Sequence, residues 1–217
     1  MHPVVDDVKT QSLRQEQAEA TRRRIAQAAR HLFATRGYSN TSMEAVAREA
    51  GVAPRTVYTV FGAKREILSA ICEAWLEDAR ARERAQQVMA LQDPLERLHA
   101  AGAWLAGLYA AGFDVVLILE AAQDEDPETR SLLRGKLAGR NHVMDAMVAS
   151  VQQRLRVPVA EAQALFRAMA APGVYQSLVV EAGWSADRFG GWLGDLLDQQ
   201  LFDAGRPARP RRPSQRS

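Results

Sequence analysis

Three glycines, Gly37, Gly51 and Gly62, divide the first third of the sequence into segments with helical periodicity. Glycine accepts a positive φ and therefore often follows the last residue of a helix. Within each segment the apolar residues recur at intervals of three and four, which places them on one face of a helix. We therefore expect one helix that ends before Gly37, two short helices after it, and a long helix that begins near Lys64.

Helical periodicity continues through the remaining chain, and no segment alternates with the period of a β-strand. Asp93-Pro94 and Asp126-Pro127 each provide an N-cap residue followed by a proline, a pair typical of a helix start. Pro158 begins another helix, and Pro172-Gly173 predicts a kink within it. The expected fold class is all-α, with about nine helices: an N-terminal three-helix domain that contains a helix-turn-helix, and a C-terminal helical bundle.

The sequence pattern divides the chain into four segments. Residues 1–17 lack an apolar period and are expected to be flexible. Residues 18–75 hold the short helices, and residues 76–205 form the bundle. Residues 206–217 contain five arginines and no acidic residue, and we expect a disordered basic tail that aids solubility or makes a second contact with a polyanion.

The overall net charge of +2 conceals an asymmetry along the chain. Residues 1–65 contain 11 Lys and Arg against 6 Asp and Glu, whereas residues 66–205 contain 12 against 20. A basic N-terminal part joined to an acidic body indicates that the basic part binds a polyanion. Chance clustering of charge is the alternative.

Several classes of protein do not fit this sequence. Its one cysteine, Cys72, excludes a disulfide scaffold, and no Cys and His residues have the spacing of a zinc site. No segment approaches the roughly 20 apolar residues of a membrane span, and the polar, acidic N-terminus differs from a signal peptide. The phosphate loops and nucleophile motifs of enzymes do not occur. We expect a cytoplasmic protein with no membrane association, catalytic activity, cofactor or metal.

The two short helices flank the tight turn of a helix-turn-helix, with Gly51 as the turn residue. In the second of them Val57 and Phe61 are four residues apart and are expected to face inward, which leaves Arg55 and Thr59 facing outward. Such a helix can enter the major groove of DNA. Arginine is there the side chain best suited to the O6 and N7 atoms of guanine.

This part of the sequence resembles the TetR-type (TetR/AcrR) family of bacterial transcriptional regulators. The residues that carry the resemblance are Leu32-Phe33-Ala34-Thr35-Arg36-Gly37-Tyr38, Thr41-Ser42-Met43 and Gly51-Val52-Ala53-Pro54-Arg55-Thr56-Val57-Tyr58-Thr59-Val60-Phe61-Gly62-Ala63-Lys64. It covers roughly residues 18–75 without a gap and places the helix-turn-helix at about residues 42–61.

The resemblance implies roles for individual side chains. Those expected to contact DNA phosphates are Thr41, Ser42, Tyr58 and Lys64. Those expected to approach bases are Pro54, Arg55 and Thr59. Val60 stands where the family often has His or Tyr, and Ala63 replaces the usual cap of the fourth helix. Each candidate also has a plain interpretation: Tyr58 as a half-buried aromatic, Arg55 as a solvated residue, and Arg22–Arg24 as the polar face of a helix.

For the bundle, the resemblance implies a domain that binds a small molecule and forms a homodimer. Methionines and aromatic residues suit an adaptable apolar pocket, and plain core packing is the alternative for each of them. The candidates are Trp104, Tyr109, Met144, Met147, Phe166, Met169 and Tyr175. Glu120 ends an apolar run, so it is either a partly buried carboxylate that favours a cationic or hydrogen-bonding ligand or an exposed acid at a helix end.

The last two helices are the candidates for the dimer interface. Gly190, Gly191 and Gly194 are poor helix residues unless another chain segment approaches them closely. The apolar face expected to pack against a partner comprises Phe189, Trp192, Leu193, Leu196, Leu197 and Leu201. Two such helices from each protomer would form a four-helix bundle with two-fold symmetry.

A two-fold dimer requires an operator that is an inverted repeat. The function that the resemblance implies is a repressor that a small-molecule effector releases from a palindromic operator in double-stranded DNA. The alternatives are an activator or an effector-independent DNA-binding protein of the same fold, and an enzyme is disfavoured.

Overall fold

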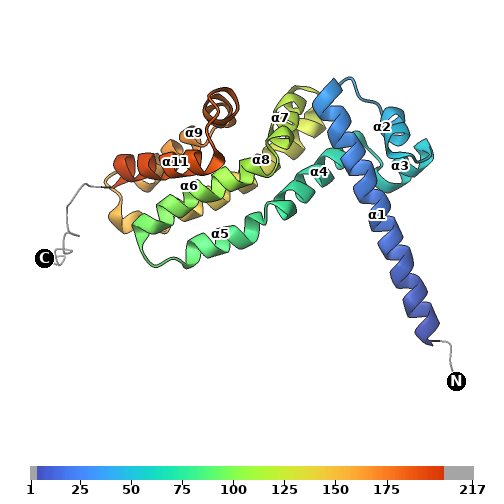
Figure 1. The fold of residues 1–217 in the computed structure, drawn as a ribbon, viewed down its shortest axis with the longest axis horizontal. Helices are drawn as coiled ribbons and strands as arrows, with labels where there is room; N and C mark the ends of the chain where they lie inside the picture. Colours follow the sequence, from blue (N-terminus) through green and yellow to red (C-terminus); the bar gives the residue numbers. More distant parts are fainter. Residues whose placement is uncertain (1–3, 203–217) are drawn as a thin grey trace, which may run out of the picture. The chain divides into compact units, whose positions relative to one another are not determined.

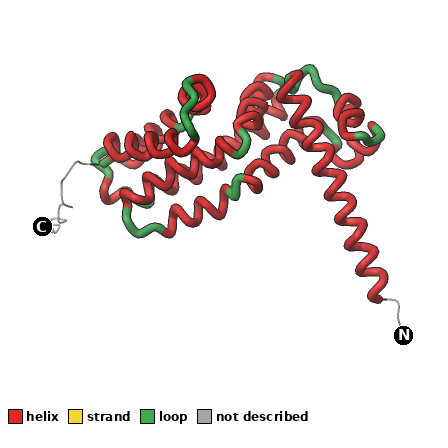
Figure 2. The backbone as a smooth tube through the Cα atoms, in the orientation of Figure 1, coloured by secondary structure: helices red, strands yellow, loops and turns green. Residues whose placement is uncertain are grey.

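The computed structural model describes residues 4–202, which are almost entirely helical (Figure 1). The loops that join the helices are short (Figure 2). Over these residues there are eleven α-helices rather than about nine. One extra helix arises because Arg80, at φ 50°, interrupts the chain between α4 (Lys64–Asp78) and α5 (Ala81–Ala90).

The other extra helix arises at Pro172, where a kink was expected. Proline has no amide hydrogen and cannot continue the backbone ladder of the preceding helix. The structure accordingly ends α9 (Val159–Met169) and starts the short α10 (Pro172–Tyr175), which continues as a π-helical segment, η3 (Gln176–Glu181). Between Leu155 and Phe202 there is an isolated antiparallel bridge, and the part of the chain that is described forms no extended strand.

The chain folds as two compact units. One comprises Met1–Trp75 and Phe113–Gly135, and the other comprises Leu76–Gly112 and Lys136–Ser217. The segment 113–135, which the sequence assigned to the C-terminal bundle, therefore belongs to the same unit as the short N-terminal helices.

The first unit is built from α1 (Val4–Arg36), α2 (Met43–Ala50), α3 (Pro54–Phe61) and most of α4. It also contains α7 (Phe113–Ala121), the 3-10 turn η1 (Ala122–Asp124) and the beginning of α8 (Pro127–Ala149). The apolar face of each short helix turns inward, and the buried core includes Ile25, Leu32, Phe33, Val46, Val57, Phe61, Ile67 and Leu68.

The first helix is longer than expected. Residues 1–17 were predicted to be flexible, but α1 begins at Val4, and only residues 1–3 of that segment lie outside the described part. No glycine or proline follows Pro3 until Gly37, so nothing in the sequence stops the helix. The side chains of residues 13–20 are all exposed.

The second unit contains α5, α6 (Pro94–Ala110), the rest of α8, the 3-10 turn η2 (Gln152–Arg154), α9, α10, η3 and α11 (Ala186–Leu201). The Asp93 carboxylate caps α6 by accepting hydrogen bonds from the amides of Leu95 and Glu96, at 2.7 and 3.4 Å. The Ser185 hydroxyl caps α11 in the same way, at 3.1 Å from the Arg188 amide.

Glycines let α6 and α11 approach closely within the second unit. A Cβ atom added at Gly102 would lie 2.8 Å from the Gly190 carbonyl oxygen and 2.9 Å from the Gly194 amide nitrogen. A Cβ added at Gly194 would lie 2.9 Å from the His99 Cα. The close approach expected from Gly190 and Gly194 is thus present, but the segment that approaches is α6 of the same chain. Gly191 faces open space.

This packing corrects the predicted dimer interface. Four of its six residues are completely covered within the protomer: Phe189, Leu193, Leu197 and Leu201. They repeat every four residues and form the stripe of α11 that faces its own unit. Trp192 and Leu196, on the flank of that stripe, keep part of their surface exposed.

The basic tail, 206–217, lies outside the described residues. Within residues 4–202, no single helix has both the length and the apolar composition of a membrane span, although Pro94–Ala110 and Phe113–Asp124 meet that test when taken together.

Candidate nucleic-acid interface

The turn between α2 and α3 has the geometry expected of a helix-turn-helix. Gly51 has φ 64° and ψ 39°, a left-handed conformation that glycine adopts without strain. The Val52 amide donates to the Ala47 carbonyl at 3.0 Å, which closes the turn. At the other end of α2, the Ser42 hydroxyl accepts from the Ala45 amide at 3.1 Å and caps the helix.

The α3 helix separates an inner and an outer face as the spacing predicts. Val57 and Phe61 are buried, whereas Arg55 and Thr59 are exposed. Pro54 occupies the first turn, where its missing amide hydrogen has no structural cost. The Thr59 hydroxyl donates to the Arg55 carbonyl at 2.8 Å. Four of the candidate residues thus share one solvent-facing surface, which we call the outer face of α3: Pro54, Arg55, Tyr58 and Thr59.

Thr41 does not fit its predicted role as a phosphate contact. Its side chain is 2% exposed, and its hydroxyl donates to the Gly37 carbonyl at 2.8 Å. This hydrogen bond ties the loop before α2 to the end of α1. Ser42, the next residue, is exposed and remains a candidate for phosphate.

Sequence reasoning missed a partner of Tyr58. Its hydroxyl donates to a carboxylate oxygen of Glu44 at 2.9 Å, which links α3 to the first turn of α2. The pKa of Glu44 is lowered, first by its own backbone amide and then by the Tyr58 hydroxyl, and the same bond raises the pKa of Tyr58. Tyr58 is 47% exposed. The signal in the sequence was an acidic residue two positions after Ser42, at the start of the helix that precedes the tight turn.

Lys64 lies at the start of α4 and points back toward α1. Its ammonium donates to the Tyr38 carbonyl at 2.7 Å and lies 4.0 Å from the centre of the Tyr38 ring. Burial lowers the pKa of Lys64, while the carboxylates of Glu125 and Asp126 act in the opposite direction. A phosphate would have to compete with these contacts for the ammonium group.

The three consecutive arginines of α1, Arg22–Arg24, also differ from one another. Arg22 lies 4.4 Å from the centre of the Phe61 ring and donates to the Val60 carbonyl at 3.3 Å, so it has a structural contact with α3. Arg23 forms an exposed ion pair with Glu19 at 3.3 Å. Arg24 is exposed.

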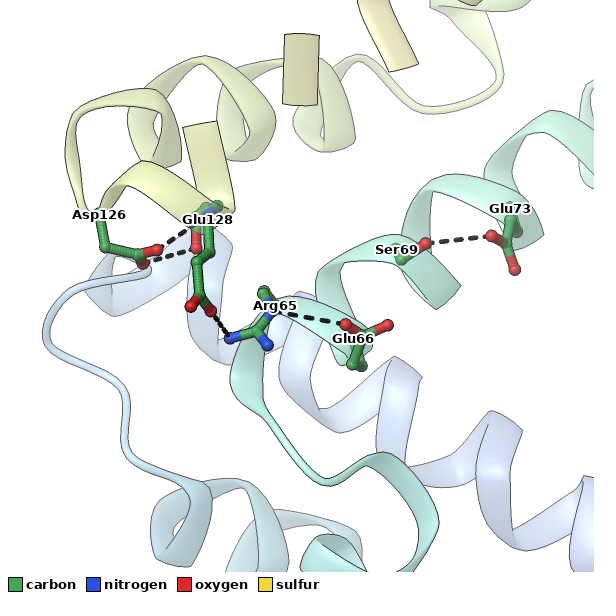
Figure 3. A network of polar contacts seen from close by, with 7 residues as sticks. Arg65, Glu66, Ser69, Glu73, Asp126 and Glu128 are labelled. Carbon is green, nitrogen blue, oxygen red and sulfur yellow. Dashed lines mark hydrogen bonds and ion pairs between the residues drawn. The ribbon is translucent and has the colours of Figure 1, made fainter. Parts of the chain in front are cut away.

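An acidic segment at the α7–α8 junction packs against the helices of the first unit (Figure 3). The Asp126 carboxylate caps α8, at 2.8 Å from the Thr129 amide and 2.6 Å from its hydroxyl. Glu128 pairs with Arg65 at 2.5 Å, and Glu125 accepts from the Ser39 hydroxyl. These contacts explain why this segment belongs to the first unit.

A second link to α1 comes from α7. The Arg30 guanidinium donates through Nε and Nη2 to the two oxygens of Asp114, each at 2.6 Å. The hydrogen bond from Arg30 holds the pKa of Asp114 below its usual range. Both side chains are partly exposed, and the paired geometry fixes the orientation of α7 on α1.

The predicted pocket residues lie in the interior of the second unit, with two exceptions. Those that are buried are Trp104, Tyr109, Met144, Met147, Phe166 and Tyr175. Met169 is partly exposed, and Glu120 is exposed and belongs to the first unit, which leaves it as an acid at a helix end. The indole of Trp104 donates to the Ala81 carbonyl at 2.9 Å, and the rings of Tyr109 and Tyr175 meet edge to face at 5.1 Å. This packing fits the core interpretation, and the pocket stays a prediction.

Comparison with known proteins connects this geometry to a family. Residues 25–71 match the family model described as "Bacterial regulatory proteins, tetR family". The chain is 30% identical over 131 residues to the HTH-type transcriptional regulator HbdR of Aromatoleum sp. (strain CIB), covering 60% of this chain and 57% of that protein. It is 34% identical over 85 residues to UidR of Escherichia coli (strain K12), covering 39% of each chain. The chain thus spans about half the length of the curated relatives that it matches.

Solved structures share the fold of most of this chain at lower identity. A transcriptional regulator from Saccharomonospora viridis in complex with choline has a TM-score of 0.68 at 22% identity, with 86% of this chain and 100% of that chain covered. FadR from Bacillus subtilis in complex with stearoyl-CoA has a TM-score of 0.67 at 18% identity, with 80% and 96% covered. NalD of Pseudomonas aeruginosa has a TM-score of 0.68 at 21% identity, with 86% and 97% covered. The helix-turn-helix geometry, the family match over residues 25–71 and the similarity to named regulators together show that the N-terminal part of this chain is similar to the TetR family of bacterial regulatory proteins.

Proposed function

We propose that this protein is a transcriptional regulator that binds double-stranded DNA with the outer face of α3. The observation that supports this most directly is the exposure of Pro54, Arg55 and Thr59 on that face, while Val57 and Phe61 hold the helix on the core. A helix presented in this way fits the major groove. The relatives named above are regulators, and HbdR and UidR are named as HTH-type regulators of transcription.

In this proposal the side chains near α3 divide the work of recognition. Arg55 reads guanine through O6 and N7, and Pro54 and Thr59 approach neighbouring bases. Ser42 and the amides at the start of α2 approach a phosphate, because that helix end carries the positive end of the helix dipole. Thr41 has no role in contact with DNA. Lys64 and Tyr58 reach a phosphate only by exchanging the partners that they have in the free protein.

We propose further that the second unit binds a small molecule that changes the affinity for DNA. Two structurally similar proteins are in complex with choline and with stearoyl-CoA, so this fold accommodates ligands of different chemistry. Release of the operator requires that the effector binds one conformational state more tightly than the other. NalD, another neighbour, is a repressor, which favours repression over activation. Such a regulator works in the bacterial cytoplasm, at the nucleoid.

The proposal includes a homodimer whose interface differs from the predicted one. Phe189, Leu193 and the other buried residues of α11 are occupied within the protomer, so Trp192 and Leu196 are the large apolar residues of that helix that can meet a partner. A two-fold dimer presents two copies of α3 to two half-sites. The operator is then an inverted repeat.

Selection of bound duplexes from a random-sequence pool, at fixed salt, tests the proposed function. We expect an enriched inverted repeat. In the Arg55→Ala variant, the same selection should lose its preference at one base position per half-site, at a cost of about 1–3 kcal/mol for the preferred base. Salt-sensitive binding without any enriched sequence would refute a sequence-specific regulator. A uniform loss of affinity in Arg55→Ala would refute its role as a base reader.

A further inference from the structure

One arginine of the second unit is partly buried and has no charged partner within the part of the chain that the structure describes. Arg140, on α8, donates through Nη1 to the Tyr109 hydroxyl on α6 at 3.0 Å. That hydroxyl donates in turn to the Ala170 carbonyl at 2.6 Å, and the Tyr109 side chain is completely buried. The Nε atom of Arg140 is also buried, and it has no hydrogen-bond partner. Burial of a guanidinium donor without an acceptor is costly, so this atom requires an explanation.

Other arginines of the same chain show which acceptors the Nε–Nη2 edge of a guanidinium binds. Arg30 places Nε and Nη2 on the two oxygens of Asp114, and Arg80 places the same two atoms on Glu83. Arg97 directs both atoms to the Leu91 carbonyl. In Arg140 the Nη2 atom has only a 3.3 Å contact with the amide oxygen of its neighbour Asn141. No carboxylate of the described residues lies within ion-pair distance of Arg140, so a carboxylate on its Nε–Nη2 edge would have to replace only the Asn141 contact.

The residues around Arg140 indicate which other chemical groups a ligand bound by its guanidinium would have. Met144 and Met147 follow it at i+4 and i+7 and therefore share its face of α8. Both methionines are buried, at 0% and 1% exposure. Methionine side chains are flexible and can repack around an apolar guest. This face of α8 thus combines a guanidinium that has one unsatisfied donor with buried methionines that can repack.

We propose that the Nε–Nη2 edge of Arg140 binds the carboxylate of the effector, and that the effector is an organic acid with an apolar body. This inference rests on the proposed function of the second unit and specifies its ligand. A planar carboxylate accepts two parallel hydrogen bonds from this edge, as Asp114 does from Arg30. A cationic ligand would place two positive charges together in the interior. The one acid that sequence reasoning offered for a cation, Glu120, is exposed and belongs to the first unit.

Calorimetric titration of the full-length protein tests the proposal with matched probes. These are the saturated carboxylates hexanoate, decanoate and tetradecanoate, with decanamide as the neutral analogue and decyltrimethylammonium as the cationic one. We expect at least one carboxylate to bind, and decanamide to bind at least tenfold more weakly than decanoate. In Arg140→Gln the carboxylate should lose at least tenfold in affinity, while decanamide should be unaffected. Arg154→Gln removes the same charge from an exposed residue of the second unit and should change neither affinity.

Arg140→Lys separates a loss of binding from a loss of folding, because lysine keeps the positive charge but cannot present the planar paired donors. It should retain the circular dichroism and melting behaviour of the wild type and still lose carboxylate affinity. Equal binding of decanoate and decanamide, tighter binding of the ammonium compound, unchanged affinity in both Arg140 variants, or no binding of any carboxylate would each overturn the proposal. The duplex selection is independent of these titrations, so a protein that selects an inverted repeat but ignores carboxylates would refute the ligand class alone.

Discussion

The α3 and α11 helices both bury an apolar stripe inside their own unit, but they differ in what they leave outside. On α3 the exposed side chains are polar or conformationally rigid, with Arg55 and Thr59 at their centre. On α11 the flank of the stripe carries Trp192 and Leu196, which remain partly exposed, together with Gly191. A surface of the first kind suits a polyanion, and one of the second kind suits another protein surface.

The comparison shows that an apolar stripe identifies the covered side of a helix and that function depends on the other side. In α3, Val57 and Phe61 account for the stripe, and the neighbouring positions are free to meet DNA. In α11, Leu193 and its neighbours account for the stripe, and any contact with a partner must use what remains.

The largest expected effect comes from filling the space that lets α6 and α11 meet. Gly102→Leu places a Cβ atom 2.8 Å from the Gly190 carbonyl oxygen and 2.9 Å from the Gly194 amide nitrogen. Because these two atoms belong to the backbone of α11, the helices must separate. We expect a loss of about 3 kcal/mol or more in the free energy of unfolding, measured by urea titration. Gly191→Ala is the matched control, since a Cβ there meets open space, and it should gain up to about 1 kcal/mol. An equal response of the two variants would contradict the close packing.

Two leucines of α11 separate packing within the protomer from association between protomers. Leu193→Ala removes a completely buried side chain and should cost about 2–5 kcal/mol in the free energy of unfolding. Leu196→Ala, on the partly exposed flank, should cost less in the stability of the protomer but weaken the proposed dimer.

Sedimentation velocity at several concentrations measures the association, and urea titration measures the stability. A dimer that dissociates in Leu193→Ala while the protomer stays fully stable would return the buried stripe to the interface and overturn the assignment made from its burial.

The same comparison explains how far the sequence could be interpreted. The helix-turn-helix was predictable because Gly51, Val57 and Phe61 act over a few residues, and short connections leave the three helices one way to pack. The packing of α6 on α11 was not predictable, because it depends on Gly102, which is about 90 residues away in the chain. Residue spacing carries no information about such a contact. The stripe was recognised correctly, and the partner assigned to it was wrong.

The roles of single polar residues were also difficult to predict from the sequence. Thr41 and Ser42 are adjacent and both suit a helix cap, and only the structure shows that one hydroxyl is buried and the other exposed. Arg140 was missed because a lone arginine in a helical pattern is indistinguishable from a surface charge until its neighbours are known. The N-terminal extension of α1 was missed because a stretch of helix with no apolar face leaves no periodic signal.

A smaller effect distinguishes the two hydroxyls before α2. Thr41→Val removes the hydrogen bond to the Gly37 carbonyl and should cost about 1 kcal/mol in the free energy of unfolding, with no change in DNA affinity at temperatures where the variant is folded. Ser42→Ala removes a helix cap, at a similar cost of about 1 kcal/mol, and should also weaken binding to every duplex to a similar degree. Fluorescence anisotropy with a selected and a random duplex measures this difference. A loss of DNA affinity in Thr41→Val would restore its role as a phosphate contact.

The smallest expected effect concerns Glu44, the acidic residue beside the outer face of α3. Glu44→Gln removes a negative charge that faces the DNA phosphates and frees the Tyr58 hydroxyl from a charged acceptor, so affinity should rise for all sequences, on the order of threefold at low salt.

Protonation of the Glu44 carboxylate should raise the affinity for DNA in the same way. Because hydrogen bonds lower the pKa of Glu44, the stability that its contacts provide is present above the unfolded pKa and is lost only as the pH falls through the lower folded pKa. The wild type should therefore gain affinity below the usual range of glutamic acid, and Glu44→Gln should not. A change in base preference at one position, in place of a uniform gain, would instead make Glu44 a reader of cytosine.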